Sequence, residues 1–254
     1  MTDGKHTVEY ELKGEVARIY LNRPHRLNAV IPQLVEELVF ALDRAERDQA
    51  KAAILSGRGR VFCSGHDLKF NQKEETESEK RARLQKVQDI TRKIRQAPFP
   101  YIAAVHGYAL GAGCEFALCC DLVIAEKNAK FGFPEVGVGL SVTGGISHIL
   151  PKAVGLVKSK ELLFLGEKIA ASEAKQLGLI NFVVDSDELE TASLELANRL
   201  ASLSQPALSR AKFILNNGSQ MSMESALEME IEHVLSTTSS EEALKAAEDF
   251  RAKK

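Results

Sequence analysis

Apolar and polar residues follow two periodicities along the first 185 positions of this chain. After Pro32, apolar residues recur at helical spacing over residues 34–45, which predicts an amphipathic helix. Residues 74–96 are highly charged with a thin apolar stripe, which is typical of a helix lying on the surface. Short apolar runs predict strands at residues 8–12, 17–21, 52–56, 101–105, 122–125 and 180–184.

The pattern changes after Asp187, because no further strand signal follows. Ser172 is expected to cap a short helix over residues 174–177 that Gly178 ends. We therefore expect an α/β core over residues 1–185 and a helical region over residues 186–254. The helices expected in that region cover residues 187–203, 206–216, 221–237 and 240–253.

Composition narrows the classes of protein to consider. The chain has 254 residues, of which 44% are hydrophobic and 27% charged, as in an ordinary globular protein. A net charge of −2 and a pI near 6.3 argue against a nucleic-acid footprint over the whole domain. No run is long enough to cross a membrane, and the N-terminus lacks an apolar signal core. We expect a cytoplasmic protein, with the mitochondrial matrix open for a mature eukaryotic form.

Four cysteines, at positions 63, 114, 119 and 120, have no spacing typical of a metal site. Cys119 and Cys120 are adjacent and stand in an apolar run. We expect buried free thiols in a reducing compartment and no metal.

The most informative segment is residues 106–121, HGYALGAGCEFALCCD, which follows the apolar run at 101–105. The order predicts a strand, a tight glycine turn over 107–113 and then an amphipathic helix. A helix N-terminus presents unpaired backbone N–H groups and a partial positive charge, so an anion can bind there. Ala112 and Glu115 are three residues apart and would share one helix face. A backbone donor and a carboxylate would then face the same pocket.

A second glycine turn, Ser64-Gly65-His66-Asp67-Leu68, follows the apolar residues 61–63 and is expected to open another helix. Two such turns could direct two N–H groups at one carbonyl oxygen, where each donor is typically worth about 3–4 kcal/mol. Glu135 stands between glycines and apolar residues, a setting that raises a carboxyl pKa. Taken singly, each turn is also consistent with a structural role, and Glu135 with a solvated loop glutamate.

Six segments of the chain carry a family resemblance: NRPHRLNAV (22–30), GRVFCSGHDL (59–68), AVHGYALGAGCE (104–115), DLVIA (121–125), FGFPE (131–135) and ELLFLGEKIAASEAKQLGLINFVV (161–184). In these motifs, and in their order and spacing over nearly its whole length, the chain resembles the crotonase superfamily, typified by enoyl-CoA hydratase. The resemblance implies a crotonase-like α/β spiral of ββα units that builds two roughly perpendicular sheets, followed by a C-terminal helical trimerisation region. It also implies a homotrimer or a dimer of trimers.

The resemblance also implies roles for individual residues. His66 and Ala112 would supply the two N–H groups of an oxyanion hole, and Glu115 and Glu135 fall on the positions of the hydratases' paired glutamates. Glu115 would deprotonate water for attack at C3 of a 2-enoyl-CoA, and Glu135 would deliver the proton to C2. No metal or redox cofactor is implied. The residues expected to bind the CoA part of the substrate are Arg26, Leu27, Ser64, His66, Asp67, Leu68 and Lys69.

Reversible hydration of a 2-enoyl-CoA thioester is thus the expected activity, in fatty acid metabolism. The chain departs from the family pattern after Glu135, where residues 139–145 lack the proline and one glycine of the hydratase loop. Two alternatives therefore stay open among enzymes, an enoyl-CoA isomerase and another acyl-CoA enzyme such as a hydrolase or decarboxylase. A further alternative is a non-catalytic, RNA-binding homologue, for which nine Lys/Arg against five Asp/Glu over residues 69–95 are a small hint.

Overall fold

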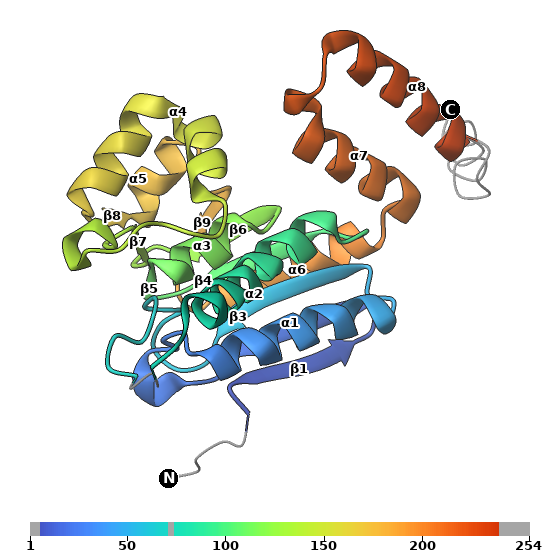
Figure 1. The fold of residues 1–254 in the computed structure, drawn as a ribbon. Coiled ribbons are helices and arrows are strands. Elements are labelled where there is room, and N and C mark those ends of the chain that lie inside the picture. Colours follow the sequence, from blue (N-terminus) through green and yellow to red (C-terminus); the bar gives the residue numbers. More distant parts are fainter. Residues whose placement is uncertain (1–5, 71–73, 239–254) are drawn as a thin grey trace.

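A computed structural model describes residues 6–70 and 74–238, which form an α/β structure with two sheets (Figure 1). The larger sheet has six strands in the order β1-β2-β3-β4-β6-β9, and the smaller has three, β5-β7-β8. The strands are β1 (Val8–Lys13), β2 (Val16–Leu21), β3 (Ala52–Gly57), β4 (Tyr101–Val105), β5 (Tyr108–Leu110), β6 (Leu122–Glu126), β7 (Lys130–Gly132), β8 (Ile169–Ala170) and β9 (Phe182–Val184). The helices are α1 (Pro32–Arg47), α2 (Glu77–Gln96), α3 (Ala112–Leu118), α4 (Ile146–Leu165), α5 (Ala171–Gln176), α6 (Leu189–Ala201), α7 (Gln205–Asn217) and α8 (Met223–Thr238).

The larger sheet is parallel except for β1, which pairs antiparallel with β2. Because side chains alternate along a strand, β2, β3, β4 and β6 each contribute residues to two different cores. Leu55 of β3 packs in the core that contains buried residues of α1, α2 and α3. Its neighbour Ile54 packs on the other face, against α6. Every expected strand is present, and so are the helices expected over residues 34–45 and 74–96.

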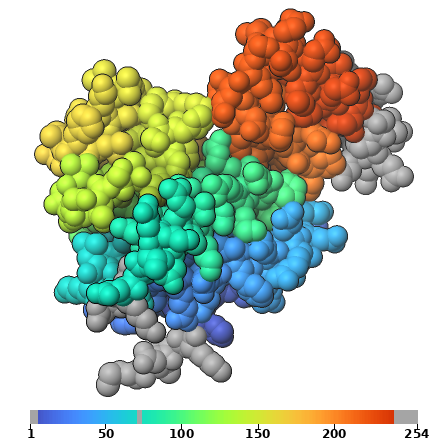
Figure 2. Space-filling view, viewed as in Figure 1, coloured from blue at the N-terminus to red at the C-terminus, as the bar shows by residue number. Residues whose placement is uncertain are grey.

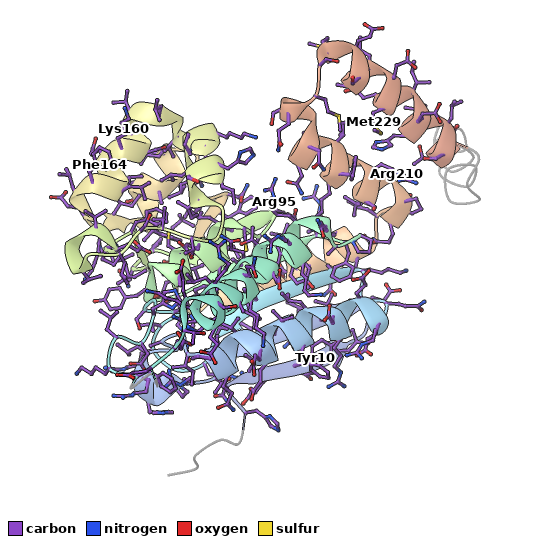
Figure 3. All side chains as sticks on the ribbon, in the orientation of Figure 1. Tyr10, Arg95, Lys160, Phe164, Arg210 and Met229 are labelled. Atoms are coloured by element: carbon purple, nitrogen blue, oxygen red, sulfur yellow. The ribbon has the colours of Figure 1, made fainter. Side chains whose placement is uncertain are left out.

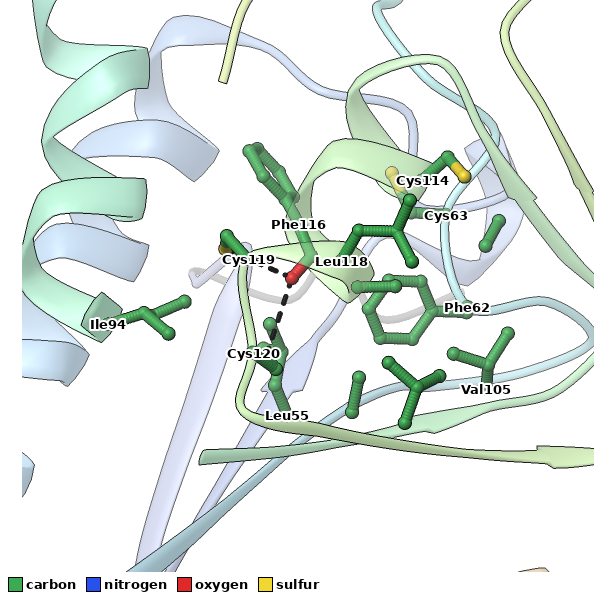
Figure 4. Close-up of a cluster of buried hydrophobic side chains, with 14 of the residues drawn as sticks. Leu55, Phe62, Cys63, Ile94, Val105, Cys114, Phe116, Leu118, Cys119 and Cys120 are labelled. Atoms are coloured by element: carbon green, nitrogen blue, oxygen red, sulfur yellow. Dashed lines mark hydrogen bonds between the residues drawn. The ribbon is translucent and has the colours of Figure 1, made fainter. Parts of the chain in front are cut away.

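Helix α3 differs from the amphipathic helix that the sequence predicted. All its residues are buried, including Glu115 with 1% of its surface exposed. The preceding glycine turn contains the short strand β5, which pairs with β7. The four cysteines are free and buried as expected, and the thiols of Cys119 and Cys120 both donate to the Phe116 carbonyl (Figure 4).

One expectation about residues 146–178 is wrong, and one helix there was not predicted. Helix α5 begins after Ala170, so Ser172 lies inside it and is not its cap. The sequence analysis also contained no equivalent of α4. This helix is interrupted at Gly155, whose φ of 77° and ψ of 159° are not helical, and it contains Pro151. The break disturbs the apolar periodicity by which a helix of this length is usually recognised.

The helices beyond residue 186 occupy two different environments. Helix α6 covers one face of the larger sheet, where its Leu189 and Ala197 are buried. Helices α7 and α8 form a lobe beside the one that contains α4 (Figures 1 and 2). Lys212 anchors α7, because its Nζ lies 2.8 Å from Asp121 Oδ2 and donates to two carbonyls near the end of α2. The helix expected over residues 240–253 lies outside the described residues.

Candidate active site

The segment at Gly65 and His66 forms a parallel β-bridge with Val30, and it does not open the helix that the sequence predicted. The Val30 N–H donates to the Gly65 carbonyl at 2.8 Å, and the Asp67 N–H donates to the Val30 carbonyl at 3.0 Å. This parallel bridge takes up backbone groups that a helix would need. A backbone donor at this position therefore belongs to a bridged turn and not to the N-terminus of a helix.

The corner at Gly111, before α3, lies directly against the corner at Gly65. The Leu110 N–H donates to the Cys63 carbonyl at 3.0 Å, which joins the two segments. At Gly111, with a φ of 53°, an added Cβ would stand 3.6 Å from the Gly65 Cα, so the two backbones are in contact. The N–H groups that follow these glycines belong to His66 and Ala112. Within residues 6–70 and 74–238 neither N–H has a hydrogen-bond acceptor.

Glu115 extends from α3 to the loop before α4. Its Oε1 accepts from the Thr143 N–H at 2.6 Å, and its Oε2 accepts from the Thr143 hydroxyl at 2.7 Å. Burial raises the pKa of Glu115 above its ordinary value, and the two Thr143 hydrogen bonds oppose that rise. The carboxylate is thus buried, and both its oxygens are hydrogen-bonded.

Glu135 is in a different environment, although it too is buried. Its Oε2 has no hydrogen-bond partner among the described residues, and its Oε1 lies beside the Gly111 corner. Burial, reinforced by the negative charge of Glu115, raises the pKa of Glu135 to about 7. The site therefore holds two carboxyl groups with different hydrogen bonding, one of which can exchange a proton near neutral pH.

Two adjoining hollows lie at these groups. The smaller, of about 80 Å³, is lined by His66, Ala112 and Glu135 together with Ser64 and Leu68. The larger, of about 550 Å³, shares His66 and Leu68 with it and extends to the side chains of α2 and the Thr143 loop. Burial and the Arg83 guanidinium lower the pKa of His66, so its ring is neutral at neutral pH. A ligand carbonyl placed in the smaller hollow would leave room for an attached chain in the larger one.

The other residues expected at the CoA channel divide into two groups. Arg26 and Lys69 are exposed cations. Leu27, which stands between Arg26 and the buried Asn28 in the chain, is half-buried. The Asp67 carboxylate, by contrast, is nearly buried and pairs with Arg23 at 3.2 Å. Although burial opposes ionisation, the Lys69 N–H and the Arg23 and Arg26 guanidinium groups lower the pKa of Asp67. In this structure Asp67 ties the His66 segment to residues 23–26.

Three residues that support the site were missed by the sequence analysis as functional positions. Thr143 binds Glu115, Arg23 binds Asp67, and Asn28 is completely buried. The Asn28 amide donates to the carbonyls of Val61 and Phe62 at 2.8 and 3.1 Å. A polar side chain in the apolar run LNAV was the one available signal for Asn28.

The structure describes no group of three His, Cys, Asp or Glu residues placed to hold a metal ion within residues 6–70 and 74–238. None of the helices in that part of the chain is long and apolar enough to cross a membrane.

Comparison with known proteins shows the family to which the chain belongs. The chain is 37% identical over 229 residues to a short-chain-enoyl-CoA hydratase of Clostridium acetobutylicum, covering 89% of this chain and 87% of the relative. It is 37% identical over 222 residues to a crotonyl-CoA hydratase of Syntrophomonas wolfei, covering 87% and 85%. The enoyl-CoA hydratase of Bacillus anthracis, at 32% identity, superimposes with a TM-score of 0.91 over 98% of this chain and 97% of the other. That fold confirms the crotonase-like α/β architecture. A sequence model of the enoyl-CoA hydratase/isomerase family matches residues 11–254, and the chain therefore belongs to this family, within the crotonase superfamily.

Proposed function

We propose that this protein catalyses the reversible addition of water across the 2,3 double bond of a 2-enoyl-CoA thioester. The observation that supports the proposal is that the buried Glu135 lines the same hollow as His66 and Ala112, whose N–H groups have no acceptor among the described residues. Glu115, the second buried carboxyl group, lies close enough to raise the pKa of Glu135. The thioester oxygen would accept from the N–H groups of His66 and Ala112. These donors stabilise the negative charge that develops on that oxygen when a nucleophile attacks C3.

The two glutamates would divide the proton transfers between them. Glu115, hydrogen-bonded as a carboxylate, would take a proton from water while the water oxygen bonds to C3. Glu135, with a pKa of about 7, would give its proton to C2 as the enolate collapses to the 3-hydroxyacyl thioester. A proton exchange between the two carboxyl groups and solvent restores the starting state. The scheme needs no metal or redox cofactor.

The CoA part of the substrate would lie along Ser64, Leu68 and Leu27, outside the smaller hollow. Arg26 and Lys69 are the expected charge partners for its phosphates. The acyl chain would enter the larger hollow beside α2. Crotonyl-CoA is the first substrate to test, because two relatives are named for short-chain and crotonyl substrates.

The test follows the ultraviolet absorbance of the enoyl thioester with short, medium and branched substrates. Hydration removes the conjugated double bond, so the absorbance should fall with every substrate that the protein accepts. A lack of hydration across the whole panel would refute the proposal. The isomerase alternative predicts a different result, namely incorporation of solvent deuterium without addition of water.

Assembly into a homotrimer or a dimer of trimers is also part of the proposal. Leu215 of α7 and Met223 of α8 are 81% and 76% exposed, and Phe164 projects from α4 with 67% exposed (Figure 3). Exposed apolar side chains of this size on helices are typical of surfaces that associate. Analytical ultracentrifugation tests the expectation, and a monomer at micromolar concentration would contradict it.

A further inference from the structure

Thr143 contacts both oxygens of the Glu115 carboxylate, and it does so with two donors from one residue. The backbone N–H reaches Oε1 at 2.6 Å and the hydroxyl reaches Oε2 at 2.7 Å. Hydrogen bonds to an ionised acceptor are shorter and stronger than those between neutral groups. Two donors on opposite oxygens also fix the rotation of the carboxylate plane, as a guanidinium does.

The loop that carries Thr143 is itself fixed from two sides. The Thr91 hydroxyl of α2 donates to the Gly144 carbonyl at 2.9 Å, and the Ile146 N–H donates to the Thr143 carbonyl at 3.0 Å. Gly144 has a φ of 54°, and an added Cβ would stand 2.9 Å from the Glu115 Cβ. The loop is therefore packed directly on the glutamate, and its backbone cannot shift freely away.

We propose that Thr143 is a positioning residue that holds Glu115 ionised and in one orientation, so that Glu115 acts as the base and Glu135 as the acid. This inference rests on the proposed function. Without Thr143 the two buried carboxyl groups would differ much less, because Thr143 supplies the hydrogen-bond donors recorded for Glu115 among the described residues. The hydroxyl and the N–H of Thr143 thus determine that Glu115 is the base and Glu135 the acid.

The two hydrogen bonds from Thr143 leave Glu115 able to accept a proton. A carboxylate has about four lone-pair positions, and Thr143 occupies two of them, so each oxygen keeps one for a substrate water. In the forward reaction the water proton moves to Glu115 while the new C–O bond forms at C3. The Thr143 hydrogen bonds make the ionised form reappear when that proton leaves.

The titratable groups around Glu115 are Glu135 and two thiols. The Glu135 and Glu115 charges repel each other. Burial raises the pKa of Cys63 to about 12 and that of Cys114 further still, so both thiols stay uncharged. Among the described residues, a change in the pKa of Glu115 in a variant therefore reports on its contacts with Thr143 and on the charge of Glu135.

The experiment compares Thr143→Val, which removes the hydroxyl at nearly constant volume, with Thr143→Ser, which retains it. Thr7→Val is a matched control, because Thr7 also donates its N–H and hydroxyl to a glutamate, Glu37, at 2.6 and 3.0 Å. That contact joins the start of β1 to α1, remote in sequence from the active-site loops. If Thr143→Val does not fold, Thr143→Ala removes the same hydroxyl in a smaller volume and is interpreted in the same way.

Two measurements are made on each variant. The pH profile of kcat/KM reports the free enzyme's base in its acidic limb. Removing a donor to the ionised form raises the pKa of Glu115, so the acidic limb should move up by about one unit in Thr143→Val and kcat/KM should fall about tenfold to a hundredfold. Carbon-13 NMR of labelled glutamates, with the Glu115 signal assigned from Glu115→Gln, should show the same upward shift. Thr143→Ser and Thr7→Val should keep the wild-type values.

The two readouts separate the outcomes. An unchanged Glu115 titration and an unchanged pH profile in Thr143→Val overturn the inference, even if hydration is observed in the wild type. A fall in activity with no change in the titration overturns it too, and indicates that the hydroxyl contacts the substrate. A shifted titration in a protein that hydrates no enoyl-CoA leaves Thr143 as the residue that keeps Glu115 ionised and refutes only the proposed function.

Discussion

Replacing Asn28 with alanine should destabilise the protein strongly, because this side chain joins residues 23–28 to residues 58–62 beneath the site. Asn28 is fully buried, and its oxygen accepts from the Arg23 N–H at 2.8 Å. Its amide nitrogen donates to the carbonyls of Arg58, Val61 and Phe62 at 2.9, 2.8 and 3.1 Å. Asn28 also has a φ of 54°, a left-handed conformation that asparagine tolerates better than alanine.

The size of the effect follows from the groups that lose a partner. The Arg23 N–H and the Val61 and Phe62 carbonyls are buried and would become unsatisfied, whereas water can reach the partly buried Arg58 carbonyl. Each buried group left without a partner costs about 1–3 kcal/mol. Allowing for relaxation, we expect Asn28→Ala to lower the free energy of unfolding by about 3–5 kcal/mol, at the upper end for a single substitution.

Urea unfolding at one fixed protomer concentration measures this change, since stability depends on concentration in an oligomer. Asn28→Gly removes the left-handed penalty and keeps the loss of hydrogen bonds, so it should still lose more than about 2 kcal/mol. Asn22→Ala is the control: its amide makes one long contact of 3.4 Å at the surface, and a change within about 0.5 kcal/mol is expected. A loss below about 1 kcal/mol for Asn28→Ala would refute the reasoning.

Further predictions concern the two acids, the loop and α7. Glu115→Gln and Glu135→Gln should each lower hydratase kcat by about 10²–10⁴-fold, while calorimetry with a saturated acyl-CoA shows unchanged affinity; near-normal turnover would disprove the assigned role. Gly144→Ala should lower kcat/KM in the absorbance assay, because its Cβ would meet Glu115 at 2.9 Å, whereas Gly137→Ala, with nothing within 4 Å, should not. Lys212→Met should lower the unfolding free energy by about 1–3 kcal/mol, because it leaves the partly buried Asp121 carboxylate and two backbone carbonyls without their donor; wild-type urea and proteolysis profiles would contradict this.

The pattern of apolar residues was sufficient to predict the strands of the larger sheet and the helices α1, α2 and α6. These elements bury residues at regular spacing, and that spacing is a local property of the chain. Helix α4 was missed because Gly155 interrupts its regular geometry. The turn Ser64–Leu68 does not open the expected helix, because hydrogen bonds to residues 27–30 take up backbone groups of Ser64, Gly65 and Asp67.

What the sequence by itself determined was the strands of the larger sheet, the described α-helices other than α4, the membership in a family and the candidate acids Glu115 and Glu135. Only the tertiary structure decided which groups meet. The contact between Gly65 and Gly111 and the reach of Thr143 to Glu115 join segments that are 28 or more residues apart in the chain. Such contacts depend on how the sheets and helices pack, and packing is not encoded in any local periodicity. The raised pKa values of the two acids also depend on tertiary structure. Burial and hydrogen-bond partners set these pKa values, and both influences exist only in the folded state.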